Sequence, residues 1–559
     1  MRIATFAAAL ILCLACSPLG AAGPNSSPDA YQAEPAAVRG GTLTASDFEY
    51  PVTLNPLTGL TDLELRLGGL VFAPLWGFDD QLRPYADLAR EVPTQGNGDV
   101  HTSPDSRSMT VDVKLSPGLR WSDGQPLTAD DVIFTLQALK DPATQALSPA
   151  GLDRLKDVRR VSGSELLLTF DGIYAPYLQL GAGLFVMPKH RLGTVSRSEW
   201  SRDAFFQRPD VASGPFVVQD AVPGDRIVFG ANPGYATAGQ PHRHRVNLDR
   251  LVFKAQTGKA ALLAALGSGA AELGLHLAAA DLPSLTGMAS SSPLVSYGLR
   301  DVSVLPNHRA NSPGGRPPPW LDDPRVLDAL NLAVDRSEIV RQALAGAGRP
   351  ARGVFPRALR GYADGTWIPA GRDLPHSQRL FEEAGWSQDV TGLRSKDGRR
   401  LDFGLLTVCG SALDDRVMQT LRAQWQEAGA GVSASCLPRD AFLRATAAGA
   451  FDMALASNGW GTDPNDWAAP AAGQSGLGAG LCPQSGLQVS FSRGASTLQL
   501  DGRRKAYQQA EREWLASHCT LPLVEVPQVT QVSTRLRNFA PSPGPGLETW
   551  NAADWWLAA

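Results

Sequence analysis

The chain has 559 residues, a formal net charge of −4 and 43% hydrophobic residues. It is about twice the length at which one hydrophobic core stops growing, so more than one lobe is expected. The balanced charge excludes a strongly basic, phosphate-binding surface, and the hydrophobic content excludes a disordered chain. The 56 glycines and 42 prolines favour many short elements of mixed α and β type over a long helical bundle.

The N-terminus is predicted to be an export signal that is not part of the fold. Arg2 precedes an apolar run over residues 3–15, which has the length of a signal-peptide core and is too short to span a bilayer. Cys16 lies where cleavage of a lipoprotein signal would leave an acylated first residue. Simple secretion after cleavage near residues 20–23 is the alternative.

Residues 1–15 are therefore predicted to be a lipoprotein-type signal peptide. Residues 16–37, rich in Ser, Pro, Asn, Gly and Ala, are predicted to be a flexible tether. After the signal, no apolar run reaches the ~18 residues that a membrane span needs. The mature protein is expected outside the cytoplasm, either lipid-anchored at the cell membrane or free in the periplasm.

The first half of the chain is rich in strand patterns. Strict alternation of apolar residues between positions 108 and 115 predicts a half-buried strand. Thr128 is expected to cap a helix that carries acidic residues in its first turn. Shorter alternating runs predict further strands at residues 166–170, 216–218, 226–229 and 251–253.

Helical patterns enter in the second half. Amphipathic spacing predicts three helices, at residues 324–344, 375–384 and 498–516. A fourth helix, at residues 414–428, lies between strand-like runs at 401–408 and 431–435. This order is that of a β-α-β unit, so the second half is expected to be α/β.

Four cysteines follow the signal, and disulfides are the default state for an exported chain. Cys409 ends the first strand of the β-α-β unit and Cys436 ends the second. Because neighbouring parallel strands end at the same edge of a sheet, we predict a Cys409–Cys436 disulfide. By elimination, Cys482 would pair with Cys519.

No motif for catalysis or metal binding occurs. The eight histidines form no H-E-x-x-H pattern, and neither a G-x-S-x-G elbow nor a P-loop is present. The one histidine cluster, at residues 242–244, is interpreted as a solvated loop. No catalytic residue, metal or cofactor is predicted, so recognition is favoured over catalysis. An exported hydrolase and a structural wall protein are the alternatives from other classes.

Several motifs, taken in chain order, resemble the oligopeptide/dipeptide-binding family of ABC-importer solute receptors, the bacterial extracellular solute-binding proteins of family 5. Leu119 to Val132 is the most recognisable stretch, with its Trp, Asp-Gly turn and capped helix. The other matches lie at residues 41–43, 53–56, 213–216, 223–225, 232–235, 324–336 and 383–386. The resemblance covers the chain from about residue 40 to the C-terminus.

The resemblance implies an α/β, periplasmic-binding-protein-like, two-lobed clamp of the class II type with an additional third domain. Lobe I would be discontinuous and the extra domain would contain the Trp121 motif. The implied boundaries are 38–82, 200–302 and 523–559 for lobe I, 83–199 for the extra domain and 303–522 for lobe II.

The family's ligand segment, G-W-x-x-D, is matched by Gly459, Trp460, Gly461 and Asp463. In peptide-binding members this segment pairs with the peptide backbone, and its Asp receives the ligand's α-ammonium. Asp463 is therefore expected to be a dry carboxylate opposed only by the ligand. Asp466 is an alternative anchor, and a plain turn at Asp463 with Trp460 in the core is a third reading.

The function implied by the resemblance is that of an extracytoplasmic receptor, without enzymatic activity, that binds short peptides and delivers them to the permease subunits of an ABC transporter. A monomer is expected, with contact to the membrane only through a lipid anchor and none to nucleic acid. A receptor of the same family for a nickel chelate, an oligosaccharide or an opine is the alternative, because one fold serves many ligands.

Overall fold

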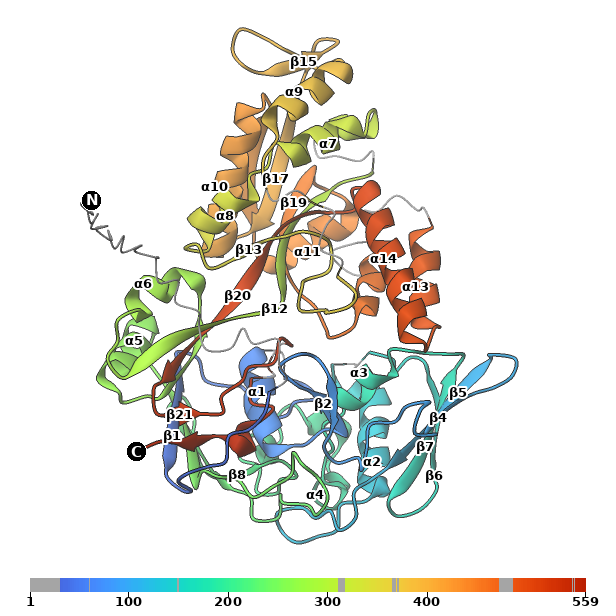
Figure 1. Cartoon of the computed structure of the whole chain (residues 1–559), viewed down its shortest axis with the longest axis vertical. Coiled ribbons are helices and arrows are strands. Elements are labelled where there is room, and N and C mark those ends of the chain that lie inside the picture. The colour runs from blue at the N-terminus through green and yellow to red at the C-terminus, as the bar shows by residue number, and fades with distance from the viewer. Residues whose placement is uncertain are drawn as a thin grey trace, which may run out of the picture.

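The structure is a computed structural model that describes residues 31–559 apart from 60, 148–149, 310–316, 364–367, 369–370, 472–485, 545 and 547. Figure 1 shows two halves. The lower half contains residues 31–290 and 534–559, and the upper half contains residues 307–520. An 11-stranded mixed sheet runs through both halves. Ten of its strands follow the order β18-β17-β19-β12-β20-β11-β1-β10-β9-β8, and β13 (Arg349–Pro350) pairs with β20 beside this path.

The lower half contains one end of this sheet. Strand β1 (Thr42–Asp47) runs parallel to β10 (Arg250–Ala255) and to β11 (Leu273–Leu277). Strands β9 (Arg226–Ala231) and β8 (Phe216–Val222) continue it in antiparallel order. The strands predicted at 216–218, 226–229 and 251–253 lie within these elements and are confirmed.

A separate four-stranded sheet, in the order β4-β5-β7-β6, lies at the edge of the lower half (Figure 1). Its strands are β4 (Val100–Thr102), β5 (Ser108–Lys114), β6 (Leu155–Arg160) and β7 (Glu165–Asp171). Met109, Val111 and Val113 on β5 are buried, as their alternation predicts.

Helix α2 (Ala129–Lys140) begins where its capping residue predicts. The backbone N–H of Thr128 donates to Asp131 Oδ2 at 2.9 Å, and the Thr128 hydroxyl accepts a bond from the first turn in return. This reciprocal cap satisfies backbone groups that a helix start would otherwise leave unpaired. The predicted N-cap at Thr128 is therefore confirmed.

The upper half contains the predicted β-α-β unit. Strand β17 (Asp402–Val408) runs parallel to β18 (Gly431–Leu437), and helix α10 (Ala412–Glu427) connects them. Cys409 and Cys436 form a disulfide with a Cα–Cα distance of 5.0 Å, which confirms that prediction. Cys519 is also disulfide-bonded, but Cys482 lies outside the described residues, so their pairing stays a prediction.

The single helix predicted at residues 324–344 is wrong. Two helices occupy this range, α7 (Arg325–Leu332) and α8 (Arg336–Ala343). Asp335 between them has a non-helical backbone, and its side chain accepts the backbone N–H of Glu338 at 2.9 Å. The apolar spacing continues across the break, so periodicity alone does not detect this internal N-cap.

Two long strands connect the halves. Strands β12 (Ser291–Pro306) and β20 (Leu521–Ser533) pair antiparallel and cross between the halves in Figure 1. Their register shifts between Tyr297 and Asp301. At Gly298 a Cβ would lie 2.5 Å from the Pro543 carbonyl oxygen, so only glycine fits here. This irregular stretch lies within the two strands that join the halves.

The predicted signal peptide, Cys16 and the first part of the tether lie outside the described residues. Residues 31–37, at the end of the predicted tether, lie along the lower half. The Tyr31 hydroxyl donates to Asp554 at 2.9 Å, and its ring packs edge-on against Trp550. Among the described residues, no helix is long and apolar enough to cross a membrane.

Candidate ligand-binding site

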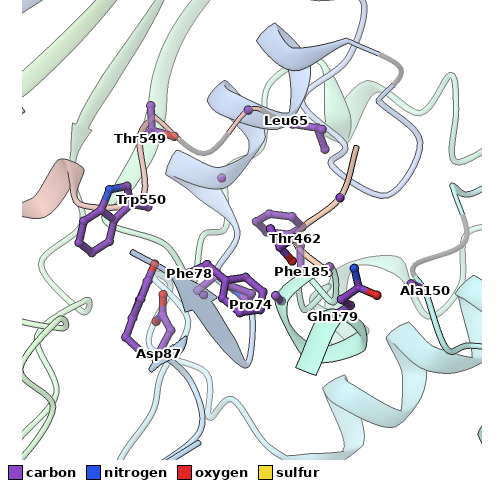
Figure 2. A pocket seen from close by; sticks show the side chains of 18 of the residues that line it. Leu65, Pro74, Phe78, Asp87, Ala150, Gln179, Phe185, Thr462, Thr549 and Trp550 are labelled. Atoms are coloured by element: carbon purple, nitrogen blue, oxygen red, sulfur yellow. The ribbon is translucent and has the colours of Figure 1, made fainter. Parts of the chain in front are cut away.

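A cavity of about 400 Å³ is lined by residues of both halves. Most of its wall comes from the lower half, including α1 (Asp62–Val71), β2 (Trp76–Phe78) and α3 (Tyr177–Ala182). The upper half contributes Gly461, Thr462 and Asp466. The wall is mainly apolar and aromatic. Figure 2 shows Leu65, Phe78, Phe185 and Trp550 among its residues, and Tyr85 and Tyr235 also line it. This size and lining are typical of a small-molecule site.

The upper-half part of the wall follows strand β19 (Met453–Gly459), which pairs with β12. The Trp460 backbone N–H donates to the Leu299 carbonyl at 3.0 Å, which continues the pairing by one residue. The Trp460 indole stacks on Trp467 with ring centroids 4.2 Å apart and donates its Nε1–H to Asp301. These contacts hold the predicted ligand segment against the ribbon that joins the halves.

Asp301 is a buried carboxylate within that ribbon. It lies opposite Glu525 on β20 and accepts hydrogen bonds from Ser303 and Trp460. Burial raises the pKa of Asp301 to about 6. The cavity segment begins directly after Trp460. The hydrogen bond from Trp460 to Asp301 therefore fixes the position of this segment relative to the ribbon.

Asp463 is buried, and its carboxylate already has a cationic partner within the chain. Arg503 on helix α14 (Leu500–Ala516) places Nη2 at 2.8 Å from Oδ1 and 2.7 Å from Oδ2 of Asp463. Asp463 Oδ1 also accepts the backbone N–H of Asn465 and so begins the turn that follows. The expectation that the Asp463 carboxylate is opposed only by the ligand is therefore wrong.

Asp466 is the carboxylate that faces the cavity. Its two oxygens lie 3.1 Å from Gln179 Nε2 on α3, so the contact crosses from the upper to the lower half. Among the described residues, no Lys, Arg or His forms an ion pair with it. Burial, followed by the nearby charge of Asp463, raises the pKa of Asp466 to about 7.

Gly461 makes room for this carboxylate. A Cβ at position 461 would lie 2.0 Å from Asp466 Oδ2. Gly459 differs, because no heavy atom lies within 4 Å of the place where its Cβ would stand. The two glycines of the motif thus have separate roles: one admits the Asp466 side chain, and the other leaves backbone open to approach.

A second carboxylate lines the opposite end of the cavity, where Figure 2 places Asp87 beside Trp550. Arg243 Nη1 lies 2.6 Å from Asp87 Oδ1, and the guanidinium also contacts the Ser213 carbonyl and the ring of Tyr235. Burial raises the pKa of Asp87, and the charge of Arg243 opposes that shift.

The interpretation of residues 242–244 as a solvated loop is wrong for two of the three residues. Arg243 is 1% exposed, and His242 packs against the ring of Tyr85 and lies near that of Trp550. Burial lowers the pKa of His242, so its ring is neutral at pH 7. Tyr85 and Trp550 come from distant parts of the chain, and no local sequence signal indicates that they meet His242.

Sequence reasoning also missed Gln179 and Arg503. Gln179 lies 287 residues from Asp466, its partner, and Arg503 lies 40 residues from Asp463. Neither belongs to a motif. The sequence brought together Trp460, Gly461, Asp463 and Asp466 because they are neighbours in one segment, but it favoured Asp463 as the anchor and gave Asp466 only as the alternative.

The family model described as "Bacterial extracellular solute-binding proteins, family 5 Middle" matches residues 84–476. The oligopeptide-binding protein AppA of Bacillus subtilis (strain 168) is 24% identical over 472 residues, which cover 82% of this chain and 80% of that protein. Protein XP55 of Streptomyces lividans is 29% identical over 379 residues, 66% of this chain and 61% of that one.

Solved structures show the same fold. AppA from Bacillus subtilis in complex with a nonapeptide has a TM-score of 0.70 at 21% identity, covering 93% of this chain and 100% of that one. NikZ from Campylobacter jejuni in complex with Ni(L-His) has a TM-score of 0.71 at 20% identity, covering 92% and 99%. The α/β, periplasmic-binding-protein-like fold is confirmed, and the chain belongs to family 5 of the bacterial extracellular solute-binding proteins.

Proposed function

We propose that this chain is the extracytoplasmic receptor of an ABC importer, which binds short peptides between its two halves and delivers them to the membrane permease. Relatives named as oligopeptide-binding and as putative ABC transporter peptide-binding proteins support this. The observation that carries the proposal is the Asp466 carboxylate, which faces the cavity opposite the neutral amide of Gln179 and has no cationic partner among the described residues.

The α-ammonium of a peptide fits this carboxylate. A charge taken out of water is costly unless a charge of opposite sign accompanies it, and Asp466 has no such partner among the described residues. Asp463 cannot serve equally, because Arg503 already contacts both of its oxygens. Asp466 is thus the ammonium anchor, and Asp463 positions the turn that carries it.

Ligand binding at this place would hold the two halves together. Gln179 belongs to the lower half and Asp466 to the upper half. A second contact, from the Ala175 backbone N–H to the Ala495 carbonyl at 2.7 Å, also crosses between them. A peptide whose ammonium lies between Gln179 and Asp466 adds a charged contact at this junction, which favours the closed form.

Gly459 and Trp460 would serve the peptide backbone. Gly459 is exposed at the end of β19, and no heavy atom lies within 4 Å of the position of an added Cβ. An extended peptide can therefore approach this backbone closely, as in strand addition. Trp460, held by Asp301 and Trp467, keeps this backbone in place.

The rest of the proposal concerns the whole protein. The chain has no enzymatic activity and no cofactor, is monomeric, and is attached to the membrane through an acylated Cys16. Its lobes and extra domain follow the boundaries given above. Intact mass of membrane-fraction protein tests the anchor, since an acylated chain beginning at Cys16 is expected and an unmodified chain beginning near residue 23 contradicts it.

Thermal unfolding with added ligands tests the peptide-binding function. Di- to pentapeptides should raise the melting temperature with concentration, equivalent to about 2.7 kcal/mol at a hundredfold excess over Kd. Ni(L-His), oligosaccharides and opines serve as the comparison ligands. If one of these raises the melting temperature while the peptides leave it unchanged, the chain is a receptor for a non-peptide solute.

A further inference from the structure

The charged groups of the cavity have one sign. Asp87 and Asp466 line it, and none of the described lining residues is Lys, Arg or His. The sequence extends this observation, because the internal segments outside the described residues contain a single basic residue, Arg316.

Three buried arginines lie next to the wall, but each is paired with a carboxylate of the chain. Arg243 pairs with Asp87 at 2.6 Å, and Arg503 pairs with Asp463 at 2.7 Å. Arg66, which follows the lining residue Leu65, pairs with Glu548 at 2.5 Å. These guanidinium groups balance buried acids of the protein and offer no free charge to a ligand.

The two ends of the cavity each contain a carboxylate, and aromatic residues lie between them. Figure 2 places Gln179, the partner of Asp466, at one end, and Trp550 with Asp87 at the other. Phe78 and Phe185 lie between the ends. A ligand whose ammonium contacts Asp466 therefore presents its body to an aromatic wall, where a large apolar side chain loses contact with water.

We infer that the cavity binds a peptide by its α-ammonium and a large apolar side chain, and that it leaves the peptide's carboxylate unbound. This inference rests on the proposed function. It follows from the pairing of Arg66, Arg243 and Arg503 within the chain and from the two carboxylates that line the cavity. A ligand carboxylate placed inside would be a further buried negative charge without a cation, so it stays in solvent.

Calorimetry at pH 7.5 with one peptide in four forms tests this. The probes are the tripeptide Phe-Leu-Ala, its C-terminal amide, its N-acetyl derivative and the variant that begins with Glu. The amide should bind within about threefold of the parent peptide. N-acetylation should weaken binding at least about thirtyfold, and the first-position Glu at least about tenfold.

Two variants complete the design. Asp466→Asn should make the parent and N-acetyl peptides bind within about threefold of each other, because both changes remove one interaction. Asp157→Asn, at an exposed position on β6, is the matched control and should preserve the full difference. The comparison of acid with amide uses the unmodified protein, so it does not depend on the folding of any variant.

The outcomes separate the inference from the function on which it rests. If the amide binds more than about tenfold more weakly than the acid, a partner for the carboxylate exists, so the inference is wrong although peptide binding stands. If 2-phenylethylamine binds and no peptide does, the peptide function is wrong and the inference about a bound peptide is overturned with it. Binding of EDTA with no binding of peptides overturns both.

Discussion

Arg503 Nη2 contacts both carboxylate oxygens of Asp463, at 2.8 and 2.7 Å, and both side chains are about nine-tenths buried. The same guanidinium contacts the hydroxyls of Tyr362 and Tyr507. The motif residue that was expected to meet the ligand is thus part of a polar network inside the upper half. Asp466, three residues further on, faces the cavity instead.

Asp463→Asn should therefore act on stability. Removing one member of a buried ion pair leaves the Arg503 charge uncompensated, which costs about 3–5 kcal/mol of unfolding free energy. Urea denaturation measures this loss, and ligand affinity of the folded variant should change by less than about tenfold. Adding Arg503→Gln should cost less than the sum of the two single changes, because both remove one pair.

Asp466→Asn should act on binding. The variant keeps the shape of the side chain but leaves the ligand's ammonium with neutral acceptors, a loss of about 2–5 kcal/mol or roughly thirtyfold to several thousandfold in affinity. Calorimetry with a free-amine peptide measures it. If Asp463→Asn weakens peptide binding more than Asp466→Asn does, the anchor is Asp463 after all.

Peptide affinity should pass through a maximum near pH 7.5. Below the pKa of about 7, Asp466 is protonated in the free protein, so affinity falls about tenfold per pH unit. Above about pH 8 the peptide's α-amino group loses its proton and the attraction is lost again. Calorimetry from pH 5.5 to 9 gives the profile, and Asp466→Asn should flatten its acidic side.

Without ligand, the protonated form of Asp466 favours the folded protein, whereas peptide binding requires the ionised form. Its pKa of about 7 lies above the ordinary value for Asp, so the folded protein binds this proton more tightly than the unfolded chain does. The contribution of Asp466 to stability is present at low pH and is lost as pH rises from about 4 to 7. The difference in stability between wild type and Asp466→Asn should therefore change with pH in this window, as urea denaturation at pH 5 and 8 can show.

Gly461→Ala should weaken binding without touching a charged group. The added Cβ would lie 2.0 Å from Asp466 Oδ2, so the carboxylate must leave its position beside Gln179. A loss of at least about tenfold in peptide affinity is expected. Gly267→Ala in helix α5 (Lys259–Ser268) is the control, because its nearest neighbour would lie 3.9 Å away. Equal affinity of both variants would show that the position of Asp466 does not matter for binding.

Loss of the Cys409–Cys436 disulfide should lower stability and leave peptide affinity unchanged. The bridge closes a chain segment with a sequence separation of 27 residues, which corresponds to about 3 kcal/mol on the chain-entropy account. The double variant Cys409→Ser/Cys436→Ser, compared with wild type in urea, measures the effect. Unchanged stability would mean that the β-α-β unit restrains its two strands without the bridge.

The local features of this protein could be predicted from its amino-acid sequence. The cap at Thr128, the alternation of β5 and the β-α-β unit with its disulfide each depend on residues close in the chain or on strands joined by one helix. The family resemblance rests on motifs of the same local kind. The segment that contributes Gly461 and Asp466 to the cavity could therefore be located before the fold was known.

Which carboxylate of that segment faces the cavity depends on the packing of distant helices. The two candidates, Asp463 and Asp466, lie three residues apart in one turn, and their difference comes from partners at positions 503 and 179. Packing of α14 brings the Arg503 guanidinium to Asp463, whereas packing of α3 brings the neutral Gln179 amide to Asp466. Because the charge state of a buried acid depends on what surrounds it in space, a local pattern could name both residues but could not choose between them.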